Sequence, residues 1–543
     1  MQSSNCIKEA SKACFSSCCT NPLHVAPPTA AATPRRDFVS AILSTLHPNT
    51  SFTNHESLPS LRELLSSLRD AVPNYFNTVL ADSIRAQEYH HFNLSNHVCL
   101  DYVGHGLFSY AQKSADERFF DFSYSSTNFT SYLLYGAEET EFQAAAKQRI
   151  FKYMNLSEDD YSLVFTANQS SSFNLLGHSY PFDSHQNLVT VYDCDNEALQ
   201  LMIDAARKRS ARPQSAVFSW PSLRVNSRKL RKILMSKNRG LLVFPLQSRM
   251  SGARYSYQWM NLARENGWHV LLDASALAPK EMETLGLSLF HPDFLISSFF
   301  NIFGHNPSGF CCLFVKKSSV SLLTQSSTNM GIINLVPPKL HAESSSSSSE
   351  ERSKAPLLSE IVEVDRNQEK KCEAIEFRGL DNADTLGLIL ISSRLRYLVN
   401  WLVNALLSLR HPHSGNGVPL VTVYGPRIRL DRGPAIAFNV CDWKGERVEP
   451  LLVQKLADRN NISLSLGLLK NVCFTGTMGK DKEKKKSSRG DRGVGMVSAS
   501  LGMLTNFEDV YRLWAFVSRF LDADFVEKEK WRYTALNQTT VEV

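Results

Sequence analysis

No charge of one sign dominates this sequence. The net charge is +6 over 543 residues, and the segment 480–492 alone carries seven basic and three acidic residues. A nucleic-acid surface needs basic residues spread along a face or groove, whereas a compact basic run is typical of a solvated loop. The sequence therefore predicts no nucleic-acid partner.

Long uninterrupted apolar runs are also lacking. The longest apolar stretch, 386–409, contains Arg394 and Arg396 and is typical of an amphipathic helix rather than a membrane span. The N-terminus lacks a basic start followed by an apolar core, which is the pattern of a secretory signal. We therefore expect a chain with no membrane span.

Paired cysteines and metal-ligand patterns are missing too. The eleven cysteines are odd in number and mostly lie in apolar runs, which favours a reducing, cytoplasmic location and no metal site. Residues 1–36 contain one acid, Glu9, so they are typical of a flexible tail, with a plastid transit peptide as the alternative. Acylation or metal binding at Cys14, Cys18 and Cys19 is a third interpretation.

What remains is an ordinary globular composition, 43% hydrophobic and 21% charged. Two low-complexity segments, one around Ser344–Ser349 and the lysine-rich run, cannot bury a core. They divide the chain into a flexible N-terminal extension (1–56), a large domain (57–330), a Ser-rich linker (331–372) and a small α+β domain (373–543) that contains a basic loop, disordered by this prediction, at 475–493.

Apolar runs with strand character alternate with helical patterns, which is typical of a mostly parallel sheet covered by helices. The segment 309–317 follows the preceding strand too closely for a crossover helix, so it should run antiparallel. The predicted strands are 188–193, 216–220, 241–245, 269–273 and 294–299, and the predicted helices are 197–208, 227–237 and 257–266. The small domain should contain helices at about 385–409, 449–459 and 507–521, and strands at 420–424 and 435–440.

Asp273 ends the apolar run His269–Asp273. Ligands of an open α/β sheet bind at the carboxyl ends of its strands. A carboxylate there can pair with a protonated ring nitrogen such as that of pyridoxal phosphate, although an Asp ending a strand is also commonly a turn residue.

Several motifs resemble the molybdenum cofactor sulfurases, whose N-terminal domain belongs to the class V aminotransferase and cysteine desulfurase group. The resemblance extends from about 90 to about 469 and is closest to plant-type proteins without the C-terminal sulfur-carrying domain. Five segments carry it: Leu100–Gly104; Phe165–Ser170; Phe244–Gly252, similar to Pro-Ala-Gln-Ser-Asn-Phe-Ser-Gly; Trp268–Ala274, similar to Leu-Asp-Ala-Ala; and 292–317, similar to the segment with Ser-Phe-Tyr-Lys.

This resemblance implies a pyridoxal-phosphate transferase of fold type I, a class V aminotransferase-like α/β protein, which forms a homodimer with the cofactor clefts at the subunit interface. Asp273 would bind the ring nitrogen and Ser298 the cofactor phosphate. The other implied cofactor-binding residues are Gln247, Thr166, Gln169 and Ser170.

Three departures from the family pattern concern catalysis. Asn301 stands where the family has the Schiff-base lysine, and an amide can neither form an imine nor act as the base. Asp195 falls near the position of the family's ring-stacking His. The family's persulfide Cys motif is absent, with Cys473 as the one candidate nearby, and His305 and Lys280 are weak substitutes for the lysine.

Two functions follow from this comparison. One is a catalytically degenerate member that keeps the fold, holds pyridoxal phosphate or another anion without a covalent bond, and binds a protein partner or small ligand. The other is an active sulfurtransferase that moves sulfur from L-cysteine to the molybdenum cofactor. The chemistry of Asn301 favours the first.

Overall fold

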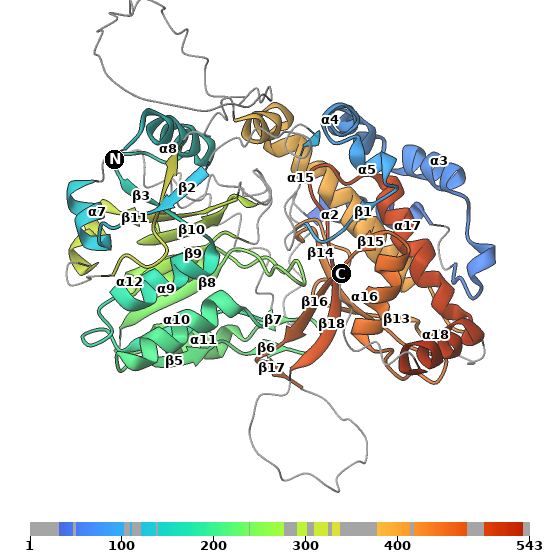
Figure 1. Ribbon diagram of the computed structural model, residues 1–543. Coiled ribbons are helices and arrows are strands. Elements are labelled where there is room, and N and C mark those ends of the chain that lie inside the picture. Colours follow the sequence, from blue (N-terminus) through green and yellow to red (C-terminus); the bar gives the residue numbers. More distant parts are fainter. Residues whose placement is uncertain are drawn as a thin grey trace, which may run out of the picture.

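The chain folds into two lobes (Figure 1). The computed structural model describes residues 32–46, 50–102, 109–110, 121–136, 139–237, 239–275, 290–300, 309–323, 328–336, 377–412, 418–474 and 493–535. Most of the predicted linker and basic loop, together with Asn301, His305 and Lys280, lie outside these residues.

A seven-stranded sheet forms the centre of the first lobe, in the order β3-β11-β10-β9-β8-β4-β5. Strand β11 runs antiparallel to both β10 and β3, which confirms the prediction for 309–317, and the remaining pairs are parallel. The strands are β3 (Tyr161–Thr166), β4 (Asn187–Thr190), β5 (Arg212–Ser215), β8 (Gly240–Pro245), β9 (His269–Asp273), β10 (Phe294–Ser298) and β11 (Cys311–Lys316).

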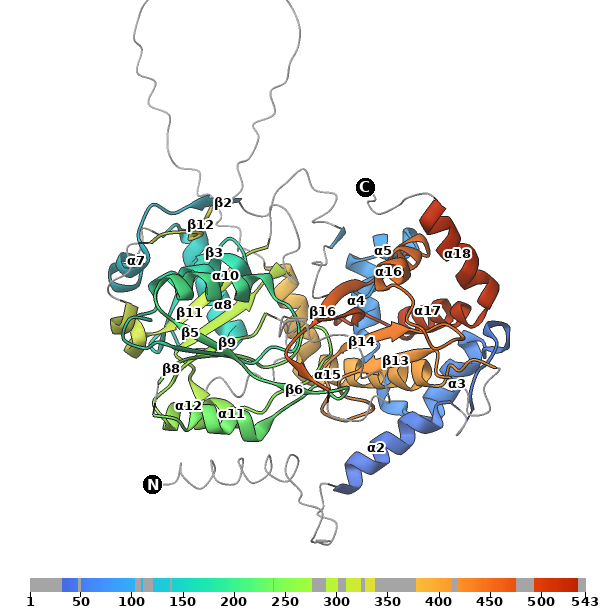
Figure 2. The ribbon, with the colours of Figure 1, turned by 90° about the horizontal axis from the view of Figure 1, so that it is seen from below.

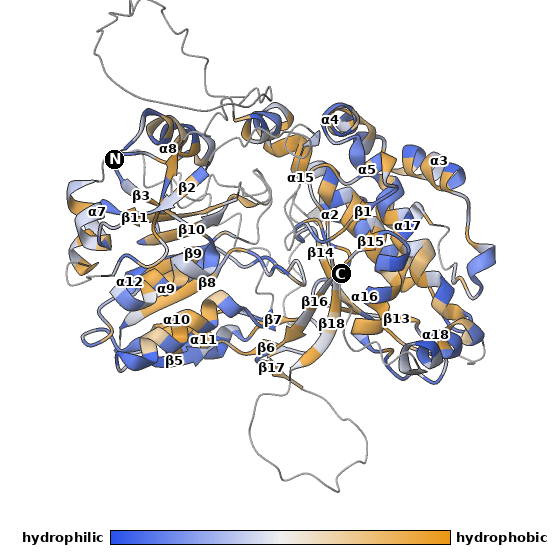
Figure 3. Ribbon diagram, viewed as in Figure 1, coloured by the Kyte–Doolittle hydropathy of each residue, from blue (hydrophilic) through white to orange (hydrophobic). Residues whose placement is uncertain are grey.

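Helices cover both faces of this sheet. Apolar colour runs along several of its strands in Figure 3. Successive residues of a strand point to opposite faces. Leu241 and Val243 pack in one cluster with α9 (Gln169–Ser179) and α10 (Glu197–Lys208). Leu242 and Phe244 pack in the other with α8 (Glu141–Met154), α11 (Ser227–Leu234) and α12 (Gln258–Glu265). Burial on both faces explains why the central strands are continuous apolar runs.

The prediction of a sheet strand at 216–220 was wrong. The edge strand is β5, which is largely exposed and contains Pro213. Proline and polar residues are tolerated at an edge, so this strand lacks an apolar run. Residues of the predicted strand instead form β6 (Phe218–Ser219), which pairs with β7 (Arg224–Val225) and with β17 (Val472–Cys473) from the second lobe.

The second lobe contains a four-stranded antiparallel sheet in the order β13-β14-β18-β16. Its elements are α15 (Arg378–Leu407), β13 (Val421–Tyr424), β14 (Ala435–Val440), α16 (Pro450–Arg459), β16 (Ser465–Leu469), β18 (Val494–Ser500), α17 (Phe507–Ser518) and α18 (Ala523–Ala535). The small α+β architecture predicted for this part of the chain is present.

The N-terminal part of the chain belongs to this second lobe (Figure 2). Helix α2 (Ala32–Ser44) packs against α15, with Ile42 buried, and β1 (Val98–Cys99) pairs with β15 (Ile462–Ser463). Helices α3 (Leu61–Ala71) and α4 (Leu80–Glu88) contact α17 and α15 respectively. The predicted boundaries therefore need correction: residues 32–46 and 50–56 are not a flexible extension, and residues 57–102 do not join the large domain.

In the described part of the chain, one helix, α15, is long and apolar enough to cross a membrane. Arg394 near its middle is fully buried and donates to Asp82 on α4 at 2.5 Å and to the Thr505 carbonyl at 2.8 Å. Packing against α2, α4 and α17 accounts for the apolar character of α15 as a core helix. Gly387, with φ of 73°, interrupts the helix.

Candidate functional site

Three strands and one helix bring predicted site residues to the carboxyl edge of the large sheet. Thr166 ends β3, Asp273 ends β9 and Ser298 ends β10, while Gln169 and Ser170 form the first turn of α9. The topology therefore gathers segments more than 100 residues apart in the chain.

Asp273 is buried, and donors from its own chain occupy both of its carboxylate oxygens. Oδ2 accepts a 2.7 Å bond from the Tyr192 hydroxyl and a 3.4 Å bond from Gln169 Nε2. Oδ1 accepts from the backbone N–H of Ser275 at 3.0 Å and from the Ser275 hydroxyl at 2.5 Å. The bonds from the two hydroxyls are short, the bond from Ser275 N has an ordinary length, and the bond from Gln169 is long and therefore weak.

Burial raises the pKa of the Asp273 carboxyl, against the lowering effects of the bonds from Ser275 and Tyr192 and of the positive charge on Arg249. Burial, together with the negative charge of Asp273, raises the pKa of the Tyr192 phenol well above its ordinary value. The shared proton therefore stays on Tyr192, which donates to the carboxylate.

The start of α9 offers donors to an anion. The side chain of Asn168 caps the helix by accepting from Ser171 N at 2.8 Å. Within the described residues no hydrogen bond uses the backbone N–H of Gln169 or Ser170. Free N–H groups at a helix N-terminus form an anion-binding site.

A protonated ring nitrogen and a phosphate fit this arrangement. A carboxylate has about four lone-pair positions, and the long bond from Gln169 is the one that a ring N–H can replace. Gln169 Nε2 keeps a 2.6 Å bond to the Ser275 hydroxyl after that exchange. Asp273 and the first turn of α9 are therefore the groups that would hold pyridoxal phosphate.

The other predicted residues have hydrogen-bond partners elsewhere in the structure. The Thr166 hydroxyl bonds to Ser172 Oγ at 2.5 Å and to the Cys311 carbonyl, and Ser298 Oγ accepts from Phe300 N at 3.4 Å. Gln247 Oε1 accepts from Arg254 at 3.3 Å, and a Cβ on Gly433 of the second lobe would lie 2.1 Å from it. Gln247 therefore packs against the second lobe.

Asp195, near the position of the family's ring-stacking His, forms an ion pair with Lys470 at 3.1 Å. The preceding Asp193 is buried and accepts 2.8 Å bonds from the hydroxyls of Ser248 and Ser251. The backbone joins the lobes at the same place, since Lys470 N donates to the Asp193 carbonyl and Asp195 N to the Leu468 carbonyl.

Cys473 lies in β17 and is partly exposed. Its carbonyl accepts from Trp220 N at 3.2 Å, so the residue is part of a sheet that includes strands from both lobes. Hydrogen bonds of this sheet therefore hold the backbone of Cys473, the predicted persulfide candidate.

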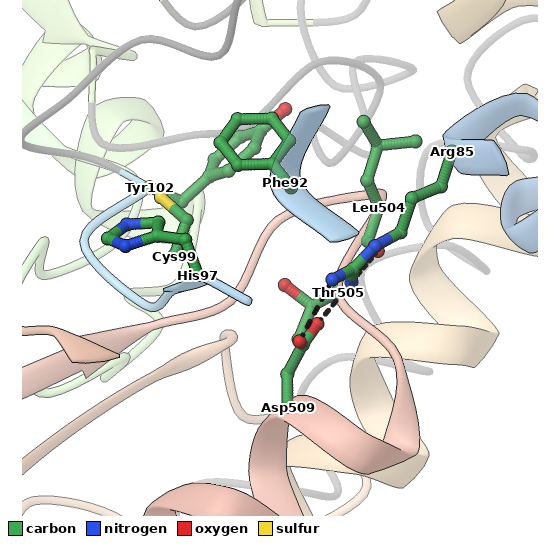
Figure 4. Close-up of a pocket in the computed structure, with 8 residues that line it drawn as sticks. All are labelled: Arg85, Phe92, His97, Cys99, Tyr102, Leu504, Thr505 and Asp509. Atoms are coloured by element: carbon green, nitrogen blue, oxygen red, sulfur yellow. Dashed lines mark hydrogen bonds and ion pairs between the residues drawn. The ribbon is translucent and has the colours of Figure 1, made fainter. Parts of the chain in front are cut away.

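A second polar cluster surrounds a small cavity in the second lobe, of about 20 Å³ (Figure 4). Arg85 donates to both carboxylate oxygens of Asp509 and to the Leu504 carbonyl. The remaining lining residues are Phe92, His97, Cys99, Tyr102 and Thr505. Such a volume holds about one water molecule, so this cavity is too small for a cofactor.

Sequence reasoning missed Tyr192, Ser275 and Arg249. Tyr192 sits inside an apolar run where nothing distinguishes it from a core residue, whereas Ser275 follows Asp273 at the spacing of an Asx-turn, which was a usable signal. Arg249 stands where the family motif has Asn, which was a second signal.

This sheet order, with one antiparallel strand and the polar groups at the carboxyl edge, defines the class V aminotransferase-like fold of the cysteine desulfurases. An apo cysteine desulfurase from Thermococcus onnurineus superposes with a TM-score of 0.50 at 15% identity, covering 79% of this chain and 95% of that one. A cysteine desulfurase from Escherichia coli also gives 0.50 at 15% identity, covering 81% and 98%.

In sequence, the chain is similar to molybdenum cofactor sulfurases. The Bos taurus protein is 27% identical over 78% of this chain and 47% of its own length, and the Arabidopsis thaliana protein is 25% identical over 77% and 56%. The human protein is 26% identical over 73% and 44%. The chain thus spans about half the length of the curated relatives it matches, and no protein-family model matches it.

Proposed function

We propose that this chain binds pyridoxal phosphate without a covalent bond and does not release sulfur from L-cysteine, so that it acts as a binding protein on the cysteine desulfurase fold. The observation that carries this proposal is Asn301, three residues beyond Ser298 and 28 beyond Asp273. An amide nitrogen cannot form the imine that lysine forms, and it cannot shuttle the substrate proton.

The residues at the carboxyl edge of the large sheet support retained binding. Asp273 supplies a carboxylate for the ring nitrogen, and the first turn of α9 supplies N–H groups for the phosphate. When bound, the cofactor would supply an electron-withdrawing ring, but this chain offers Asn301 where the family has its lysine. The expected assembly is a homodimer in the cytoplasm, with a small ligand or protein partner.

The alternative is sulfur transfer from L-cysteine to the molybdenum cofactor, which sequence similarity over about three quarters of the chain favours. General acid–base help is typically worth about 100–10,000-fold in rate, so the absence of the lysine should be visible in turnover.

The test uses the full chain titrated with pyridoxal phosphate, followed by borohydride reduction and mass spectrometry of the digest. We expect saturable binding, no reduced adduct and no sulfide release from L-cysteine. Asp273→Ala should weaken binding at least tenfold. An adduct on Lys280 or another lysine of the wild-type chain, or sulfide release above background, would overturn the proposal.

The variant Asn301→Lys tests whether residue 301 occupies the position of the family's Schiff-base lysine. Restoring the amine should give a borohydride-reducible adduct on residue 301. Asn261→Lys on α12 is the matched control and should give none. If Asn301→Lys forms no adduct although it binds the cofactor, residue 301 does not occupy the lysine position.

A further inference from the structure

Positive charge is concentrated in one segment of the large lobe. Residues 205–239 contain eleven Lys and Arg and no Asp or Glu. Subtracting these eleven charges from the net charge of +6 leaves −5 for the rest of the chain. The net charge, from which we predicted no nucleic-acid partner, therefore conceals an uneven distribution. The place that the fold gives to these side chains decides what they can bind.

The fold brings most of these cations to the amino edge of the large sheet, opposite to the edge that carries Asp273. A helix that connects parallel strands ends beside the start of the strand that follows it. Helix α10 ends four residues before β5, and α11 ends six residues before β8. Asn187 of β4 pairs with Arg212, the first residue of β5, and with Gly240, the first residue of β8. In Figure 2, α10 and α11 lie on opposite sides of β5.

Six cations at this edge are exposed and have no ion pair with any residue that the structure describes. Two neighbouring acids already pair with other arginines, Asp204 with Arg207 at 3.2 Å and Asp183 with Arg209 at 3.0 Å. We call the six cations the basic edge: Lys208, Arg212, Arg231, Lys232, Lys237 and Arg239.

The outer face of α11 continues the basic edge. Its leucines, Leu230 and Leu234, are buried in the core, whereas Arg228 and Lys229 are exposed like the two cations of the last turn. Arg228 and Lys232 are four residues apart on the helix, and like charges at this spacing destabilise a helix. The helix dipole favours cations in a last turn. It does not explain the cations of the basic edge that lie outside helices, which are Arg212, Lys237 and Arg239.

Exposed apolar side chains are scarce on this surface. Met235 is the one exposed large apolar side chain among the described residues of 205–239. A protein partner would therefore find no apolar centre for an interface, and a membrane would find little to anchor in it. Pro213 in β5 lacks the N–H that a docking strand would use. The same segment has no exposed aromatic side chain on which unpaired bases could stack.

We propose that the basic edge binds the phosphate backbone of double-stranded RNA without reading its base sequence. Cations alone bind the phosphates of a duplex, through the two-donor fork of Arg and the point charge of Lys. RNA is the nucleic acid of the cytoplasm, where this chain is expected. The inference goes beyond the proposed function and does not depend on pyridoxal phosphate, because the basic edge and Asp273 lie at opposite edges of the sheet.

Fluorescence anisotropy of a labelled RNA duplex of about 20 base pairs, titrated with the full chain, tests this proposal. We expect saturable binding that weakens as the salt concentration rises, because bound cations displace counterions from the phosphates. Two duplexes of unrelated sequence should bind equally well. The triple variant Arg212→Gln/Arg231→Gln/Lys232→Gln should lose at least tenfold in affinity, whereas Asp273→Ala should bind RNA as the wild type does.

The matched control removes three exposed cations from other surfaces, Arg62 on α3, Lys152 on α8 and Lys528 on α18, each changed to Gln. Both triple variants alter the net charge by the same amount, so a loss confined to the first assigns the binding to the basic edge. Equal losses in the two, or no saturable binding by the wild type, would overturn the inference. So would tighter binding of the wild type to poly-L-glutamate, to phosphatidylserine vesicles or to single-stranded RNA than to the duplex.

Discussion

Tyr192 and Asp273 are 81 residues apart in the sequence, yet their side chains share a buried 2.7 Å hydrogen bond at the carboxyl edge of the large sheet. The bond links the segment after β4 to the end of β9, across the intervening strand β8. It also orients the carboxylate on which the proposed ligand binding depends.

Removing this hydroxyl should weaken the fold. Tyr192→Phe leaves a buried carboxylate oxygen short of a donor, at a cost of about 1–3 kcal/mol in the free energy of unfolding. Urea denaturation monitored by circular dichroism measures it, with Tyr124→Phe, whose side chain is 69% exposed, as control. Equal losses in the two variants would contradict the role given to Tyr192.

Asp193 should give the protein a recognisable pH dependence. Burial raises the pKa of this carboxyl above 3.8, against the lowering effect of the bonds from Ser248 and Ser251. The folded state then holds its proton to higher pH than the unfolded state, so the contribution to stability falls as the pH rises from about 3.8 through the folded pKa. The unfolding free energy of the wild type minus that of Asp193→Asn should decrease over this interval.

Thermal unfolding at several pH values from 4 to 8 provides this comparison. Asp183→Asn, at a carboxylate that is 65% exposed, is the control. A difference between wild type and Asp193→Asn that grows with pH would show that the sign is wrong.

The ion pair between Arg394, in the middle of α15, and Asp82 should contribute more to the free energy of unfolding than surface ion pairs do. Asp82→Ala leaves the fully buried guanidinium of Arg394 without its carboxylate, and breaking such a pair costs roughly 3–5 kcal/mol. Because Asp82 is 39% exposed, we expect the lower end of that range in urea denaturation. Asp204→Ala, in the exposed pair with Arg207, should change stability by about 1 kcal/mol or less.

Cysteine labelling should separate core thiols from accessible ones. Burial raises the pKa of Cys311 to about 12, so almost no thiolate exists at pH 8. Native-state treatment with iodoacetamide at pH 8 should modify the partly exposed Cys473 and leave Cys311 unmodified until urea is added. Peptide mass spectrometry reads out both sites, and early labelling of Cys311 would contradict its place in the core.

The central strands of the sheet were predictable because a strand that is buried on both faces has a continuous apolar run in its sequence. Strand β5 was missed because it is a largely exposed edge strand and its residues Arg212–Ser215 form no apolar run. The attachment of α2 to the second lobe could not be read from local pattern, since an amphipathic helix does not reveal which core it covers.

The site could be predicted only in part, because some of its residues are identified only by contacts between distant segments. Asp273 could be recognised from the sequence because it is a polar residue at the end of an apolar run. Tyr192 is identified only by the distance of its hydroxyl from Asp273, which is a property of the folded sheet and not of either segment.

The mixed sheet of β17, β6 and β7 has a consequence for how the two lobes can move. Its strands come from both lobes, and Phe218 N, Trp220 N, Lys470 N and Asp195 N all donate across the boundary. Rotating one lobe away from the other would require these bonds to break together. Separating the two lobes in this protein would therefore be a local unfolding event, because several backbone hydrogen bonds would have to break at once.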